Sequence, residues 1–126
     1  MTAVRCIVET PRDTRSPGVP PVHLGFVPGT LTMRREPVGA LIVSDDPLLP
    51  GAGVEADALG VLRTTGGGDR LMCAQPGGEL SADLRERIER LYADEGAAEW
   101  LPAEAAEGLL GESRVRFAAA TLGPER

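Results

Sequence analysis

Five polar residues of this chain have side chains suited to a binding or catalytic site. They are Glu9, His23, Arg34, Glu36 and Asp69. His23 is the only histidine, and its ordinary pKa lies near neutrality, as proton transfer requires. Arg34 can grip a carboxylate or a phosphate. Four of them also have a structural alternative. His23 can be a hydrogen-bonded core histidine and Arg34 a solvated loop arginine, whereas Glu9 can bond to backbone and Asp69 can be part of a glycine turn.

The composition limits the chemistry that these residues can support. The chain has 126 residues and no lysine among its 13 basic residues, which excludes a lysine nucleophile or a Schiff base. A net charge of −6 makes nucleic acid and anionic membranes unfavourable partners. Cys6 and Cys73 are isolated in the sequence from each other and from His23, so we expect reduced cysteines, no disulfide framework and no zinc site.

Length and hydropathy predict one cytoplasmic domain covering residues 1–126. The longest apolar stretch, residues 38–43, is too short to span a bilayer. The N-terminal residues lack the charged and then apolar pattern of a secretion signal.

Short apolar runs separated by turn residues predict five strands. An alternating stretch near residues 4–8 and apolar runs at residues 22–27, 38–43, 54–62 and 71–74 are divided by clusters of Pro, Gly and Asp. The proline-rich residues 10–21 predict a loop.

The C-terminal part has a helical period. Apolar residues from Leu80 to Tyr92 recur at helical spacing behind a candidate N-cap, Ser81, and this helix should stop at Gly96. A shorter helix should run from Pro102 through Leu110, and residues 115–119 alternate as a last strand would. The expected fold is therefore α+β, a small antiparallel barrel of five to six strands, of OB type, with two flanking helices.

Several local strings in series resemble those of soluble family I inorganic pyrophosphatases. They are CIVETP at residues 6–11, HLGFVPGT at 23–30, EPV at 36–38, PLLPG at 47–51, and LGVLR at 59–63 followed by Asp69. The resemblance covers residues 4 to about 100 and implies a five-stranded barrel with flanking helices. It also implies pyrophosphate hydrolysis with several Mg²⁺ ions held by carboxylates.

The residues that carry this chemistry in the family are mostly replaced here. The family's metal motif resembles Asp-Gly-Asp-Pro-x-Asp, whereas residues 34–39 read RREPVG. One carboxylate, Glu36, remains there beside two arginines, which repel divalent cations. Glu9 and Asp69 match carboxylates that are retained. We therefore expect that magnesium-dependent hydrolysis is lost and that the chain needs no cofactor.

The replacements favour an organic ligand. Leu24, Gly39 and Leu71 stand where the resemblance implies polar or charged residues, so we expect a wider and more apolar cavity inside the barrel. In this interpretation Leu24, Arg34, Glu36, Gly39 and Leu71 bind a largely apolar small molecule. His23, Glu9 and Asp69 are then the candidate catalytic residues.

Three functions follow as hypotheses. The first is a metal-independent cyclase or isomerase of natural-product biosynthesis, for instance for an intramolecular Diels–Alder cycloaddition, which needs mainly the proximity of reacting ends. The second is residual hydrolysis of pyrophosphate or a phosphate ester, with Glu9, Glu36 and Asp69 holding one Mg²⁺. The third is a non-catalytic binding protein that forms a homo-oligomer.

Overall fold

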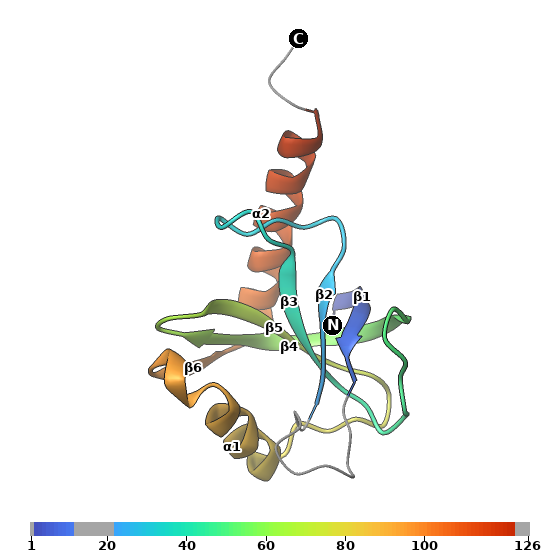
Figure 1. Ribbon diagram of the computed structural model, residues 1–126, viewed down its shortest axis with the longest axis vertical. Helices are drawn as coiled ribbons and strands as arrows, with labels where there is room; N and C mark the ends of the chain where they lie inside the picture. The colour runs from blue at the N-terminus through green and yellow to red at the C-terminus, as the bar shows by residue number, and fades with distance from the viewer. Residues whose placement is uncertain (1, 12–21, 123–126) are drawn as a thin grey trace.

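The computed structural model describes residues 2–11 and 22–122. Its strands are β1 (Thr2–Thr10), β2 (His23–Val27), β3 (Val38–Val43), β4 (Gly53–Thr64), β5 (Gly68–Ala74) and β6 (Ala98–Leu101). Its helices are α1 (Ala82–Leu91), the short 3-10 turn η1 (Ala93–Glu95) and α2 (Ala103–Leu122) (Figure 1). Most of the loop predicted over residues 10–21 lies outside the described residues, and Thr10 is the last residue of β1.

Five strands close into a barrel, as predicted, but the barrel is mixed and not antiparallel. The strand order is β1-β2-β3-β5-β4-β6, and β4 pairs back onto β1. The β3–β5 pair is parallel, whereas the other pairs are antiparallel. A closed barrel of five strands cannot be antiparallel throughout, because directions that alternate around an odd number of strands must coincide at one pair, and here that pair is β3–β5.

Alternating side chains fill the interior of the barrel. Val4, Cys6 and Val8 point inward from β1, as the period of two predicts. Ala106 and Leu110 of α2 close the interior from one side. The interior is therefore a packed core of mainly aliphatic side chains. Within it the Cys73 thiol donates a hydrogen bond to Cys6, which together with burial raises the pKa of Cys73.

A second core lies between α1 and the outside of the barrel. Ile88 of α1 is fully buried there with Leu41, Leu62 and Met72. The helix begins as predicted, because the Ser81 hydroxyl accepts a hydrogen bond from the Leu84 amide at 3.1 Å. Farther along the chain, the Trp100 indole N–H donates to Glu89 at 2.6 Å and ties β6 to α1.

The expectation of a last strand at residues 115–119 is wrong. These residues belong to α2, which continues past Gly111, and the sixth strand is β6, which pairs with β4. Alanine, the strongest helix former, dominates the end of this segment, and no proline interrupts it, so the helix continues through two glycines. No helix among the described residues is both long and apolar enough to cross a membrane.

Candidate functional site

A pocket of about 650 Å³ opens where the ends of β1, β3 and β5 meet α2. We call it the mouth pocket. Its lining residues are Glu9, Gly25, Phe26, Thr32, Met33, Arg34, Glu36, Pro37, Gly39, Gly67, Gly68, Asp69, Arg70, Leu109, Glu112 and Arg116. Seven of these are charged, so the pocket is more polar than the sequence predicted.

The fold brings five of the eight predicted site residues together at this pocket. Glu9, Arg34, Glu36, Gly39 and Asp69 all line it, although they come from β1, the β2–β3 connection, β3 and β5. Closure of the barrel is what makes these distant segments neighbours.

His23 lies away from the mouth pocket, inside the protein. Its side chain is fully buried, and Nε2 lies 3.1 Å from the backbone carbonyl oxygen of Asp46. An Nε2–H tautomer donates to that carbonyl and joins β2 to the β3–β4 connection. The geometry matches the structural alternative for His23, not a position in the pocket.

Leu24 and Leu71 also lie outside the lining of the mouth pocket. Leu71 is completely buried in the barrel core, one strand repeat deeper than Asp69. Leu24 packs against the second core, on the other side of β2 from the barrel interior. The expected apolar walls therefore belong to packed cores, because Leu24 and Leu71 lie farther along their strands from the open end of the barrel than the lining residues Phe26 and Asp69.

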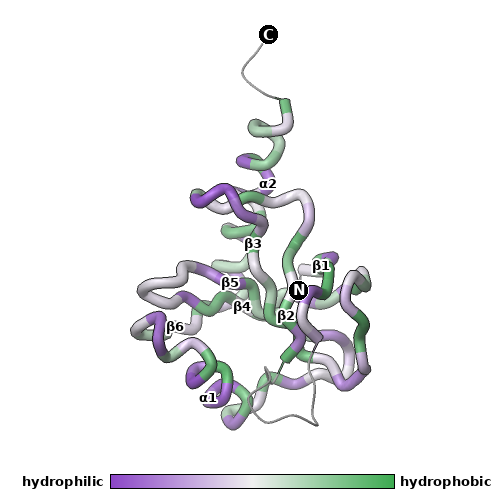
Figure 2. Tube along the Cα trace, in the orientation of Figure 1, coloured by the Kyte–Doolittle hydropathy of each residue, from purple (hydrophilic) through white to green (hydrophobic). Residues whose placement is uncertain are grey.

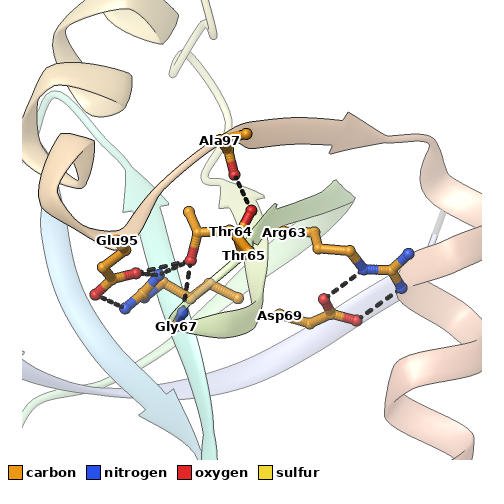
Figure 3. A network of polar contacts seen from close by, with 8 residues as sticks. Arg63, Thr64, Thr65, Gly67, Asp69, Glu95 and Ala97 are labelled. Carbon is orange, nitrogen blue, oxygen red and sulfur yellow. Dashed lines mark hydrogen bonds and ion pairs between the residues drawn. The ribbon is translucent and has the colours of Figure 1, made fainter.

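Asp69 is held in a bidentate ion pair with Arg63. The Arg63 Nε and Nη2 atoms donate to the two carboxylate oxygens at 2.8 and 3.1 Å (Figure 3). The hydrogen bond with Asp69 raises the pKa of the Arg63 guanidinium. The two residues face each other across the β4–β5 hairpin. Both carboxylate oxygens of Asp69 therefore already accept a hydrogen bond from one arginine.

A second ion pair holds the rim of the pocket. Arg70 donates from Nη1 and Nη2 to the two oxygens of Glu95, both at 2.8 Å, and the Thr64 hydroxyl donates to Glu95 at 2.7 Å (Figure 3). The Arg70 guanidinium lies 4.0 Å from the centre of the Tyr92 ring. Hydrogen bonds from Arg70 hold the pKa of Glu95 below its usual range. Burial raises the pKa of Tyr92.

The other charged groups of the pocket are not paired with one another. Arg34 and Arg116 donate to the backbone carbonyls of Gly66 and Leu31, at 3.4 and 2.8 Å. Within residues 2–11 and 22–122, the carboxylates of Glu9, Glu36 and Glu112 form no hydrogen bond or ion pair. The mouth pocket therefore presents two arginines and three carboxylates that a ligand can engage.

These residues do not fit the magnesium cluster that the resemblance implies. No group of three or more His, Cys, Asp or Glu side chains among the described residues is placed to hold a metal ion. Asp69 is engaged by Arg63, and Arg34 brings positive charge to the same pocket. We therefore derive no chemical step through a metal ion.

Three of the pocket's charged residues escaped the sequence analysis. Arg70 follows Asp69 directly, and its partner Glu95 lies in η1, beyond the reach of any local pattern. Glu112 and Arg116 were missed because the second helix was expected to end before them. The Arg63–Asp69 pair was detectable, since a hairpin turning on residues 65–67 places the two side chains opposite each other.

The comparisons with known proteins support the fold. No family model matches the chain. Among solved structures, inorganic pyrophosphatase from Ehrlichia chaffeensis superposes with a TM-score of 0.78 at 17% identity, covering 88% of this chain and 92% of that one. An inorganic pyrophosphatase from Neisseria gonorrhoeae gives 0.76 at 21% identity, covering 93% and 92%. The chain has the fold of inorganic pyrophosphatases.

Sequence relatives with this name match only part of the chain. An inorganic pyrophosphatase of Aeropyrum pernix is 40% identical over 57 residues, which are 45% of this chain and 32% of that protein. Inorganic pyrophosphatase 1 of Pseudomonas syringae is 37% identical over 71 residues, or 52% of this chain and 41% of that protein. The matched region thus spans less than half the length of these relatives, and the comparison establishes the pyrophosphatase fold without its activity.

Proposed function

We propose that the mouth pocket binds a small organic molecule of mixed polarity without a metal ion, and that this pyrophosphatase fold has lost magnesium-dependent hydrolysis. The observation that carries the proposal is the Arg63–Asp69 ion pair, which occupies the carboxylate that the resemblance assigns to a metal. The volume of the pocket, about 650 Å³, suits an organic ligand.

The lining indicates what such a ligand contains. Phe26, Met33, Pro37 and Leu109 offer apolar contacts, while Arg34 and Arg116 offer donors to a carbonyl or carboxylate. Glu9 and Glu36 accept hydrogen bonds from hydroxyl or amino groups. The ligand is thus an apolar skeleton with polar ends, which is more polar than the substrate that the sequence predicted.

The reaction class that we propose is cyclisation or isomerisation of this molecule, such as an intramolecular cycloaddition. Such a reaction depends on holding two reactive ends of one molecule together, and this proximity alone lowers the barrier by about 7–11 kcal/mol in favourable cases. Arg34 takes the role of polarising a carbonyl, since His23 is buried away from the pocket. No metal or organic cofactor takes part in this proposal.

The first test is phosphate release from pyrophosphate with Mg²⁺ at about millimolar concentration, a range in which a magnesium site of ordinary affinity fills. We expect no release from the native chain, from Arg63→Ala, which frees Asp69, or from the surface control Arg87→Ala. Release by the native chain that Asp69→Asn abolishes would overturn the loss of hydrolysis.

The second test is a thermal-shift screen of organic acids, polyenes and lactones in the presence of EDTA. A ligand at about 100 times its Kd adds about 2.7 kcal/mol to the free energy of unfolding, which raises Tm by several degrees. Gly39→Leu places a side chain in the mouth pocket and should abolish the shift for every hit. Hits that stabilise Gly39→Leu as strongly as the native chain would contradict binding at this pocket.

A second candidate function is residual magnesium-dependent hydrolysis of pyrophosphate or a phosphate ester. Two observations favour it, namely the names of the relatives and the presence of Glu9, Glu36 and Asp69 in one pocket. The release assay separates the two candidates, because only this one predicts a product that depends on both Mg²⁺ and Asp69.

A further inference from the structure

The C-terminal helix has a long face that nothing in the described residues covers. α2 contains 20 residues and is therefore about 30 Å long. Ala106, Leu110 and Ser113 are buried against the rest of the protein, all on one side of the helix. Figure 1 shows the second half of α2 extending beyond the barrel.

The uncovered face carries no charged side chain from its middle to its end. Gly108, Gly111, Val115, Ala118 and Leu122 recur at helical spacing on the side opposite the buried residues, and we call them the outer face of α2. Val115 is 71% exposed and Leu122 is 77% exposed. Figure 2 shows hydrophobic residues along α2 up to its end, with hydrophilic residues between them. A helix that is apolar on both sides is normally covered on both.

The exposed apolar residues of the protein concentrate around this helix. Among the described residues, the large exposed hydrophobic side chains are Met33, Leu49, Val115, Phe117 and Leu122. Three of them lie on α2: Val115 and Leu122 on its outer face, and the less exposed Phe117 on the side of Leu110 and Ser113. A fourth, Met33, lines a shallow pocket together with Ala119 and Ala120 of the helix. Such a concentration of apolar surface marks an interaction site.

The charges along α2 indicate which partner fits. Glu104, Glu107 and Glu112 make the first half acidic, whereas Arg114 and Arg116 make the second half basic. A second α2 in antiparallel orientation sets the basic half of each helix beside the acidic half of the other. A parallel pair would instead set like charges side by side.

We propose that the outer face of α2 pairs with the same face of a second copy of this chain, in an antiparallel and two-fold symmetric dimer. The two helices cross near Gly111, where the missing side chain allows a close approach, and no atom of the described chain outside the helix lies within 4 Å of a Cβ placed there. Val115 of each copy then packs over Gly108 of the other. A symmetric pair uses one patch twice, which a single self-complementary helix satisfies.

The flank of the outer face supplies an ion pair in this arrangement. Glu107 and Arg114 are seven residues apart and therefore lie on the same side of α2. Glu107 Oε2 accepts a hydrogen bond from the Thr2 hydroxyl at 2.8 Å within the chain, and no described residue is bonded to its Oε1 atom. A two-fold axis at Gly111 brings this side of both helices together and sets Arg114 of each copy level with Glu107 of the other. The dimer thus gains two such pairs, one at each end of the crossing.

The proposed interface is small, which sets the expected affinity. A stable standard interface buries roughly 800 Å² on each partner, and one pair of helices about 30 Å long buries less. We therefore expect a Kd of about 1–100 µM, and a monomer–dimer equilibrium in this range.

Sedimentation velocity of the full chain across about 1–300 µM tests the proposal. We expect the sedimenting mass to rise from monomer to dimer, and Val115→Arg to weaken the association at least about tenfold, because a charge replaces an apolar contact within the interface. Leu49→Arg is the matched control, since Leu49 is 76% exposed outside this surface, and it should leave the association unchanged. A native chain that stays monomeric, or a Leu49→Arg variant that weakens as much, would overturn the proposal.

Charge exchange tests the orientation. Arg114→Glu and Glu107→Arg should each weaken the dimer several-fold, because each sets like charges opposite each other, and the double variant should restore the affinity. Circular dichroism checks that each variant keeps its helix. A double variant that stays as weak as the worse single variant would rule out the antiparallel pair.

Discussion

At the scale of single residues, the neighbours of a carboxylate decide its chemistry. Asp69 stands where the resemblance places a metal ligand, yet Arg63 engages both of its oxygens. Glu95 follows the same pattern with Arg70. Arginine forms such bidentate pairs because its planar guanidinium matches the spacing of the carboxylate oxygens. The loop and hairpin around the mouth pocket are thus held by ion pairs.

Glu95→Gln should destabilise the protein in a pH-dependent way. Its folded pKa is lowered, so its stabilising effect is complete above the unfolded pKa of about 4.3 and is lost as the pH falls through the folded pKa. We expect a loss of about 1–2 kcal/mol in the free energy of unfolding at pH 7, fading below about pH 4. Urea unfolding between about pH 3 and pH 8 measures it.

Glu86→Gln is the matched control for this prediction. Glu86 forms a longer contact of 3.6 Å with Arg90, and both side chains are more than two-thirds exposed. Its loss should change the free energy of unfolding by less than about 0.5 kcal/mol. An effect of Glu95→Gln that stays constant down to the acid end of the range would refute the assigned role of the carboxylate charge.

At the scale of elements, the barrel closes through close approaches between strands. A Cβ atom at Gly25 of β2 would overlap the backbone carbonyl oxygen of Ile7 in β1. At Gly39, on the next strand, a Cβ atom would meet only the Arg70 Cγ atom, at an ordinary contact distance of 3.8 Å. Packing therefore requires a glycine at position 25 but not at position 39.

Gly25→Ala should therefore destabilise the protein by about 2–3 kcal/mol, because β1 and β2 must separate to admit the methyl group. Gly39→Ala should change the free energy of unfolding by less than about 1 kcal/mol, in the stabilising direction, since it restricts the unfolded chain without a clash. Chemical denaturation of both variants checks the contrast. Equal effects would argue against the close approach of β1 and β2.

At the scale of the whole molecule, the barrel interior and the mouth pocket are separate features. Leu71 is one of the largest fully buried side chains and packs in the barrel core, whereas the pocket at the end of the barrel carries charged groups. Packed side chains therefore fill the inside of the barrel, and the open pocket lies at its rim.

Leu71→Ala should lower the free energy of unfolding by about 2–5 kcal/mol, as expected for a large-to-small change in a packed core. The same change at the exposed Leu49 should cost less than about 0.5 kcal/mol. Thermal and urea unfolding compare them. A mild effect of Leu71→Ala, together with altered ligand binding, would instead support the lining role expected from the sequence.

Local patterns in the sequence were enough to predict the five strands of the barrel, the first helix and its N-cap at Ser81. These features depend on hydrophobic periodicity and on turn residues, and both are determined by residues that are close together in the sequence. The resembling strings also pointed to Glu9, Arg34, Glu36, Gly39 and Asp69, and these five residues line one pocket in the structure. The length of α2 was missed because residues 115–119 alternate as a strand does, and such a pattern can occur by chance in a helix. The short strand β6 was not predicted at all.

The side chains that reach the mouth pocket, and their partners there, could be found only in the folded chain. His23 and Leu71 are each two residues from a pocket position, yet that step along the strand takes them from the open end of the barrel into the fully buried interior. Arg70 meets Glu95 across 25 positions of sequence, and Arg116 meets the Leu31 carbonyl across 85. Such contacts depend on strand register and on where α2 docks, and these are properties of the assembled barrel.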